Sequence, residues 1–308
     1  MEYLYQRDIY GETLVELGSA DKNIVVLDAD LSSSTRTNLF ARQFPDRFFN
    51  FGVSEQNMMA AAAGLASCGK TVFVSTFAVF ASGRAWDQVR LAVSYNNFNV
   101  KIAATHAGIT VGPDGASHQA LEDIALMRVL PNMNIIVPCD GPQTADAIRA
   151  AAGAPGPFYI RLGRSKFPTI ENKGEFRLGQ AQLITDGNDL TIVACGIMVS
   201  EAILAVQNLA RKGIKARLIN MHSIRPLDSA IILKAARETK LIVVCEEHSI
   251  VGGLASSIDE VAAESSPVKV IRVGIRNRFG QSGEPEELLK EYNLTSQDIE
   301  KAVLSNIS

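Results

Sequence analysis

Residues 50–66, NFGVSEQNMMAAAAGLA, place one carboxyl side chain, Glu55, at the head of a helix-like stretch of small apolar residues. An acid in the first turn stabilises a helix through the helix dipole by about 0.3–1 kcal/mol, and the preceding Ser54 is a suitable N-cap. A carboxyl group in apolar surroundings can also hold and release a proton near neutral pH, which is the property of a working acid. The stretch taken alone leaves both interpretations of Glu55 open.

Further side chains that could do chemistry follow the carboxyl ends of predicted strands. They comprise acids, aromatic rings, imidazoles and guanidinium groups: Asp28, Asp30, Phe77, Phe80, His106, Asp114, His118, Arg161 and Arg164. In an open parallel sheet these strand ends lie along one edge, where ligands bind. Each residue alone has a simpler explanation as a cap, a core pair or a solvated charge. Their gathering with Glu55 on one edge predicts a ligand site.

The segment from Thr105 to Gln119, THAGITVGPDGASHQ, combines glycines and a proline with His106, Asp114 and His118. Glycines allow the backbone to turn sharply or to approach a ligand closely. Loops of this length inside a compact domain usually serve a function or are disordered. A surface loop with incidental polar residues is the alternative, but the composition favours function.

Short apolar runs alternate with helix-like stretches along the first half of the chain. The predicted strands are 23–30, 47–52, 71–77, 100–106, 134–140 and 157–163, and the predicted helices are 8–19, 54–67, 81–95, 119–129 and 141–152. Continuous apolar strands separated by helices indicate a parallel sheet that helices cover on both faces.

A polar stretch with glycines and a proline, residues 165–189, interrupts this pattern and indicates a connection between domains. The alternation then resumes, with predicted strands 190–196, 215–220, 240–247 and 268–274 and predicted helices 199–212, 228–238, 252–264 and 284–291. We therefore predict an α/β fold with two α/β domains, each a mainly parallel sheet flanked by helices. The predicted limits are 1–168 for the first domain, 169–188 for a linker and 189–308 for a smaller second domain.

Composition narrows the class of protein. The 308 residues are 47% hydrophobic and 20% charged, with a net charge of -3, which suits a globular protein and gives no electrostatic reason to expect nucleic acid. No apolar run is long enough for a membrane span, and the N-terminus lacks the pattern of a signal peptide, so we expect a cytoplasmic protein. The four cysteines form no CxxC pair and are expected to be reduced.

Common nucleotide and metal motifs are missing from the sequence. There is no GxxxxGK[ST] motif, and the glycines of VGGLASS do not complete GxGxxG, so P-loop and Rossmann dinucleotide sites are not supported. The four histidines, His106, His118, His222 and His248, are not spaced as zinc ligands. We therefore expect no metal site built by this chain alone.

Seven segments are familiar in combination: DADLSSS, FGVSEQNM, STFAVF, THAGITVGPDGASHQ, PNMNIIVPCDG, VACGIMVSEA and EEHSIVGGLAS. In their order and spacing they resemble the C-terminal half of transketolase, which comprises two domains of a thiamine diphosphate-dependent enzyme. The resemblance covers essentially the whole chain. It implies that 1–168 is the pyrimidine-binding domain and that 189–308 is the transketolase C-terminal domain.

The resemblance implies a role for Glu55 at the cofactor, thiamine diphosphate. In the family this glutamate hydrogen-bonds N1′ of the cofactor's pyrimidine ring and drives the imino tautomer that removes the thiazolium C2 proton. Phe77 and Phe80 match the aromatic residues that bury the ring, and Asp30 matches an acid near the cofactor. Where the family often has a tyrosine three residues after the second ring, this chain has Gly83.

The resemblance also implies a substrate site. His106 matches a histidine near the reacting hydroxyl groups, where it would transfer a proton or donate a hydrogen bond, and Asp114 matches an acid that recognises the C2 hydroxyl. The residues that match the set around the substrate phosphate are Arg7, Ser34, His118 and Arg164, with Arg161 as a less favoured alternative to Arg164. Arginine suits this task because its forked donors match oxyanions. Ala107 stands where the family often has aspartate.

Part of the family's cofactor site has no counterpart here. The family holds Mg2+ and the diphosphate through a GDG motif and a later asparagine in its N-terminal half, whereas this chain contains only PDG, CDG and TDG. Because the chain begins near Arg7, where the pyrimidine-binding domain should begin, the resemblance implies a split enzyme with a separate N-terminal subunit. We expect an α2β2 assembly with the cofactor between chains. The alanine-rich helix after Glu55 is either a contact surface for another chain or an ordinary buried helix.

The main hypothesis is therefore the C-terminal subunit of a split transketolase of the pentose phosphate pathway. With its partner it would move a two-carbon ketol unit from a ketose phosphate to an aldose phosphate. One alternative is another thiamine enzyme half, either the β subunit of a 2-oxoacid dehydrogenase or a relative of 1-deoxyxylulose-5-phosphate synthase. His106, His118 and the arginines favour phosphosugars over simple 2-oxoacids. The other alternative is a non-catalytic regulatory subunit.

Overall fold

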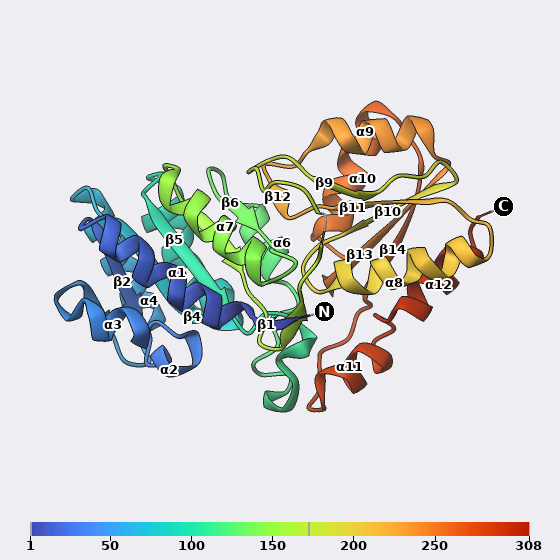
Figure 1. Cartoon of the computed structure of the whole chain (residues 1–308). Helices are drawn as coiled ribbons and strands as arrows, with labels where there is room; N and C mark the ends of the chain where they lie inside the picture. Colours follow the sequence, from blue (N-terminus) through green and yellow to red (C-terminus); the bar gives the residue numbers. More distant parts are fainter. Residues whose placement is uncertain (1, 172, 308) are drawn as a thin grey trace.

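A seven-stranded sheet forms the centre of the first of two α/β units in the computed structural model, which describes residues 2–171 and 173–307 (Figure 1). In spatial order its strands are β12 (Ser223–Arg225), β6 (Asn134–Ile136), β7 (Phe158–Arg161), β5 (Val100–Thr105), β4 (Thr71–Phe77), β2 (Ile24–Asp28) and β3 (Phe48–Asn50). All neighbours pair in parallel except β12, which is antiparallel to β6. The carboxyl ends of the parallel strands, all but β12, therefore share one edge, as predicted.

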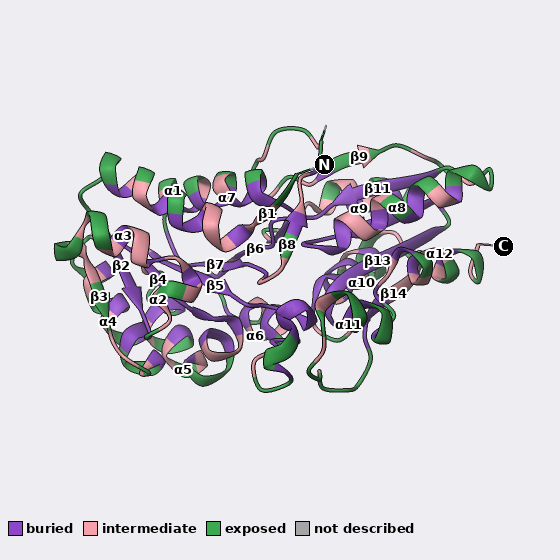
Figure 2. Cartoon of the chain, turned by 60° about the horizontal axis from the view of Figure 1, so that its bottom comes forward, coloured by how far each residue is buried: buried purple, intermediate pink, exposed green. Residues whose placement is uncertain are grey.

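Helices cover both faces of this sheet, with α1 (Gln6–Ala20) and α7 (Gly141–Gly153) on one side and α4 (Glu55–Ser67) on the other (Figure 2). Successive strand residues point to opposite faces. Val25 thus belongs to the apolar cluster that contains Met58 of α4, whereas Val26 belongs to the cluster that contains Tyr10 of α1. Burial on both faces explains why these strands read as continuous apolar runs.

The second unit is built on a five-stranded sheet. Its order is β14 (Lys269–Ile275), β13 (Leu241–Ser249), β10 (Leu190–Ala194), β11 (Ala216–Asn220) and β9 (Gln182–Thr185), and only the pairing of β9 with β11 is antiparallel. The helices of this unit are α8 (Met198–Arg211), α9 (Ser229–Glu238), α10 (Leu254–Ser265), α11 (Pro285–Glu291) and α12 (Ser296–Leu304). The predicted α/β fold class with mainly parallel sheets is confirmed.

Several short elements were not predicted. They are β1 (Tyr3–Tyr5), which pairs with β8 (Lys166–Pro168), the helices α2 (Ser32–Thr35), α3 (Asn38–Gln43) and α12, the 3-10 segment η1 (Pro45–Arg47), and the strands β9 and β12. Strand β9 lies inside the predicted linker 169–188. As a half-exposed edge strand it lacks the apolar run that marks a central strand. The domain limits themselves stay a prediction.

The predicted helix 81–95 is interrupted. The structure has a π-helical segment η2 (Phe80–Arg84), a short helix α5 (Trp86–Gln88) and a second π-helical segment η3 (Val89–Ser94). The loop after β5 contains the unpredicted 3-10 segment η4 (Ile109–Asp114), and the predicted helix 119–129 is present as the shorter α6 (Asp123–Arg128). Apolar spacing alone does not distinguish a π turn from an α turn.

Two features join the units: one strand that the second unit contributes to the sheet of the first, and a shared apolar core. β12 follows β11 in the second unit but completes the sheet of the first, and Arg225 at its end donates to the backbone oxygens of Arg128 and Leu130, both at 2.8 Å. One apolar cluster contains residues from both units, including Val137 and Ile224. None of the described helices combines the length and apolar character needed to cross a bilayer.

Candidate active site

Glu55 is the first residue of α4 and is buried, with 2% of its surface exposed. Arg84 reaches it from η2, and Nη1 of Arg84 donates to Oε1 at 2.8 Å and to Oε2 at 2.9 Å. The same guanidinium lies 4.5 Å from the centroid of the Phe80 ring. This partner was not predicted, because no sequence pattern links an acid at a helix start to an arginine in the next helical segment. Segments of π-helix often occur at functional sites, so the π-helical conformation of η2, visible only in the structure, is the signal that points to Arg84.

Four rings gather beside this ion pair, from the end of β4, the start of η2 and the loop after β5. Phe77 stacks on His106 with centroids 3.8 Å apart and lies 6.1 Å from Phe80. The His118 ring meets Phe80 edge-on at 5.4 Å. At Gly83 an added Cβ would have no atom within 4 Å, so the place where the family often has a tyrosine side chain is open. A buried carboxylate beside stacked rings fits a flat heteroaromatic ring that carries a basic nitrogen.

His106 occupies a strained and electropositive position. Its φ is +59°, in the left-handed region that residues other than glycine seldom adopt, and its Nδ1 lies 3.0 Å from Oγ1 of Thr105. Burial first, and then the charges of Arg7, Arg164 and His118, lower the pKa of His106 to about 3. The imidazole is therefore neutral at pH 7, and it can accept a hydrogen bond at one nitrogen while it donates from the other.

The guanidinium groups of Arg7 and Arg164 lie close to His106. Nη1 of Arg7 donates to the backbone oxygen of Ser34 at 3.4 Å, and Nη1 of Arg164 donates to that of Val111 at 2.9 Å. Burial and the charges of neighbouring arginines lower the pKa of Arg7. In the described part of the chain, neither guanidinium forms an ion pair with a carboxylate. Two arginines without carboxylate partners are suited to an oxyanion such as phosphate.

Other predicted residues lie outside the ring cluster. Asp30 is exposed, and its Oδ1 accepts a hydrogen bond from Nδ2 of Asn50 at 3.2 Å. Asp114 is exposed at the end of η4. Asp28 is buried and accepts from the N–H of Leu31 at 2.6 Å, so it fixes the turn after β2. Among the residues that the structure describes, Asp30 and Asp114 thus form no hydrogen bond or ion pair with the ring cluster. Their exposure allows either carboxylate to meet a ligand.

Arg161 is buried and bonded within the protein. Its Nε donates to the carboxylate of Asp123 at 2.8 Å, and Tyr159 donates to the same carboxylate at 2.7 Å. The donors of Arg161 are thus used in bonds within the protein, among them one to the backbone oxygen of Glu247 in the second unit at 3.0 Å. Within residues 2–171 and 173–307, no three His, Cys, Asp or Glu side chains gather into a group that could hold a metal ion.

Comparisons with known proteins match both halves of the chain. The family model of the transketolase pyrimidine-binding domain matches residues 3–169, and that of the transketolase C-terminal domain matches residues 179–299.

Some similar proteins are named as subunits, whereas the transketolase of Homo sapiens, 36% identical over 96% of this chain, matches it with only 48% of its own length. The 6-deoxy-6-sulfo-D-fructose transketolase subunit SqwH of Clostridium sp. (strain MSTE9) is 40% identical over 98% of this chain and 94% of that protein. One subunit of the apulose-4-phosphate transketolase of Phocaeicola vulgatus is 40% identical over 97% of this chain and 96% of that protein. A solved structure described as a split gene transketolase, inactive beta4 tetramer, is 49% identical and covers 99% of this chain and 98% of its own, with a TM-score of 0.92.

Proposed function

The chain belongs to the transketolase family, and from this premise we propose that it is the C-terminal subunit of a split transketolase. With an N-terminal partner subunit it transfers a two-carbon ketol unit from a ketose phosphate to an aldose phosphate. The observation that carries the proposal is the contact chain from the buried Glu55 carboxylate through Arg84 and Phe80 to Phe77 and His106. These contacts bring an acid, a ring-binding surface and a neutral imidazole together on one edge of the sheet.

In the proposed function the cofactor is thiamine diphosphate, which supplies a nucleophilic carbon to attack the ketose carbonyl. Glu55 hydrogen-bonds the cofactor's pyrimidine nitrogen and shares a proton with it, and burial suits this task by excluding competing water. Phe77 and Phe80 cover the ring. Asp30, exposed just after β2, is the acid near the cofactor.

The substrate lies over the loop that follows β5. His106 donates or accepts a hydrogen bond at the reacting hydroxyl groups, and its lowered pKa keeps the imidazole neutral for proton exchange. Asp114 accepts from the C2 hydroxyl of the sugar. The phosphate is bound by the electropositive group, which comprises Arg7, Ser34, His118 and Arg164.

The diphosphate and Mg2+ belong to the partner subunit in this proposal, because the GDG motif is missing from the sequence. The relatives named as subunits support an enzyme divided between chains. We place the complete enzyme as α2β2, with self-association of this subunit, in the cytoplasm. The four free cysteines suit a reducing compartment.

The test is to purify this chain and its N-terminal partner and to mix them with thiamine diphosphate, Mg2+, xylulose 5-phosphate and ribose 5-phosphate. The expected product is sedoheptulose 7-phosphate, formed only when both subunits are present. An assembled, cofactor-loaded complex that makes none would contradict the proposal. Pyruvate as the donor tests the alternative of a 2-oxoacid enzyme, which would consume it. A sulfonated ketose as the donor tests the substrate class named for the Clostridium relative.

Glu55→Ala tests the assigned acid within the same assay. We expect turnover to fall by at least about a thousandfold, because proton sharing at the cofactor is lost, while the chain stays folded. Glu264→Ala is the control, since Glu264 is an exposed acid near the end of α10, a helix that packs on α9, β13 and β14 of the second unit. Normal turnover by Glu55→Ala would refute its role, and an equal loss in both variants would indicate an effect on folding.

A further inference from the structure

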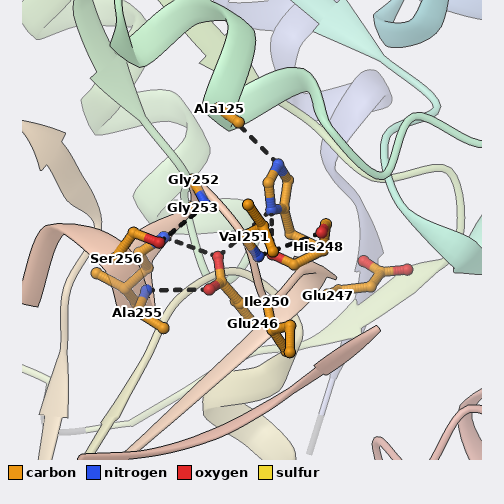
Figure 3. A network of polar contacts seen from close by, with 12 residues as sticks. Ala125, Glu246, Glu247, His248, Ile250, Val251, Gly252, Gly253, Ala255 and Ser256 are labelled. Atoms are coloured by element: carbon orange, nitrogen blue, oxygen red, sulfur yellow. Dashed lines mark hydrogen bonds and ion pairs between the residues drawn. The ribbon is translucent and has the colours of Figure 1, made fainter. Parts of the chain in front are cut away.

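Strand β13 ends in two adjacent buried carboxylates, Glu246 and Glu247, which point apart (Figure 3). Glu246 accepts hydrogen bonds from the backbone N–H groups of Leu254 at 2.7 Å and Ala255 at 3.0 Å, at the start of α10 in its own unit. Glu247 accepts the backbone N–H of Thr110 at 2.6 Å, in η4 of the first unit. Neighbouring strand residues face opposite sides, so the pair divides its contacts between the two units.

Glycine at position 108 allows the Glu247 carboxylate to lie against the loop. Gly108 has φ +84°, and a Cβ atom built there would lie 2.3–2.4 Å from the carboxylate carbon and oxygens of Glu247. Such distances are far too short, so a side chain at this position would push the carboxylate away from Thr110. The open backbone at Gly108 and the carboxylate are therefore fitted to each other.

Arg161 fixes the backbone of Glu247 in turn. Its Nη2 donates to the backbone oxygen of Glu247 at 3.0 Å and to that of Ala120 at 3.2 Å, and its Nε donates to Asp123 at 2.8 Å. Burial raises the pKa of Glu247, and the Arg161 charge opposes that effect. The residue that holds Thr110 is thus itself held against the first unit.

The loop in contact with Glu247 carries three candidate substrate residues, His106, Asp114 and His118. Backbone bonds tie its start, where the N–H of Gly108 donates to the oxygen of Ala120 at 3.0 Å. Beyond that point η4 is a short 3-10 segment interrupted at a glycine with non-helical φ and ψ. A short irregular segment has little backbone bonding of its own, so side-chain contacts decide its position.

We propose that Glu247 is a positioning residue that holds the loop 106–118 from the second unit. By fixing Thr110 it keeps His106 stacked on Phe77. The inference rests on the proposed function for the role of this loop in substrate binding, but the contact belongs to this chain alone. The second unit therefore contributes to the active site without touching the substrate.

Hydrogen exchange of the backbone amides in the full chain tests this role without partner or substrate. Glu247→Ala should raise exchange rates in 106–118 about tenfold or more, because the loop loses a charge-assisted hydrogen bond, while α10 keeps its rates. Glu246→Ala is the matched control, since this equally buried neighbour should loosen the start of α10 and leave 106–118 unchanged. Rates in 106–118 within about twofold of the unaltered chain in Glu247→Ala would overturn the proposal.

Two more variants separate positioning from general unfolding. Glu247→Gln keeps an acceptor oxygen and should stay within about threefold of the unaltered chain. Gly108→Ala introduces the clash from the loop side and should loosen 106–118 as Glu247→Ala does. Faster exchange across the whole second unit in both Glu247 variants would show a merely structural role and overturn the inference.

A kinetic measurement then connects the contact to activity. In the assembled enzyme, Glu247→Ala should raise the KM for the sugar phosphate about tenfold, with a smaller change in affinity for thiamine diphosphate, because Glu55 lies outside the loop. Equal losses for both ligands would contradict the assignment. If the assembled enzyme shows no transketolase activity at all, the proposed function fails, and the exchange rates still decide the positioning role.

Discussion

Glu55 and Arg84 form an ion pair in which the carboxylate is buried and the guanidinium side chain is 47% exposed. Burying a carboxylate without a partner is costly, so the Arg84 guanidinium compensates the charge of Glu55. In the proposed function a flat cofactor ring needs both this carboxylate and the face of Phe80 that Arg84 covers. Arg84 must therefore move aside when the cofactor binds, and its exposure allows that movement.

A double-mutant cycle tests the strength of this pair. Arg84→Gln alone should lower the free energy of unfolding by about 1–3 kcal/mol, a range between exposed and buried ion pairs, because it leaves a buried carboxylate unpaired. When Arg84→Gln is made in a protein that already carries Glu55→Gln, the further loss in free energy of unfolding should be much smaller. Urea unfolding of the four proteins measures both values. Additive effects would mean that the two residues do not interact.

His222 should make stability depend on pH. Burial lowers the pKa of His222 to about 4, whereas an unfolded histidine has a pKa of about 6.5. The contribution is thus present above pH 6.5 and is lost as the pH falls toward 4, because the unfolded chain binds the proton more readily. Between pH 7 and 5 the free energy of unfolding should fall about 1–2 kcal/mol more in the unaltered protein than in His222→Gln. Identical losses in urea unfolding at the two pH values would contradict this assignment.

At the scale of elements, the long strands were predictable, including the edge strand β14, whereas irregular segments and the polar edge strand β9 were not. The run 71–77 was predicted as a strand and is β4, whereas β9 was missed because an edge strand carries no apolar run. The residues at strand ends that the sequence pointed to include Phe77 and His106, which the structure brings into contact. Arg84 was beyond prediction, because its contact depends on a π turn that apolar spacing does not reveal.

Helix α4 is not wholly buried, and its outer face is exposed. Met58 and Ala62 face the core, and the exposed residues of the helix are Gln56, Asn57, Ala60, Gly64 and Ser67. An added Cβ at Gly64 would have no atom within 4 Å. This face is therefore open to another chain, as the proposed assembly requires.

Gly64 distinguishes a free helix face from a subunit contact. Gly64→Ala should raise the free energy of unfolding of the isolated chain by about 0.5–1 kcal/mol, because alanine favours the helix and meets no neighbour. Gly64→Gln should weaken assembly about tenfold or more by filling the contact face. The control is Gly153→Gln, because Gly153 ends α7 with equally open surroundings. Equal assembly of both Gln variants in sedimentation experiments would place the contact elsewhere.

At the scale of the whole molecule, the second unit completes the first. The second unit supplies β12 to the first sheet and Glu247 to the loop after β5, and residues of both form one apolar cluster. Such shared packing couples the stability of the two units. We therefore expect them to unfold together, although each has its own sheet.

Two probes can test this coupling, because the chain has a single tryptophan, Trp86, and two buried cysteines in the second unit, Cys195 and Cys245. Trp86 fluorescence reports on the first unit, and labelling of the two thiols reports on the second. In urea both transitions should coincide. Arg225→Ala, which removes bonds across the junction, should shift both midpoints together. Separate midpoints in the unaltered protein would show that the units are independent.

The position of β12 in the sheet of the first unit also has a consequence for synthesis on the ribosome. Strand β6 ends at Ile136, but its partner β12 begins only at Ser223. At roughly 5–20 residues per second, translation of the intervening stretch takes on the order of ten seconds. During that interval the nascent first sheet has an unpaired edge, which attracts other extended chains. The nascent polypeptide is thus most prone to aggregate midway through translation, and codons that slow the ribosome across this stretch should lower the yield of folded protein.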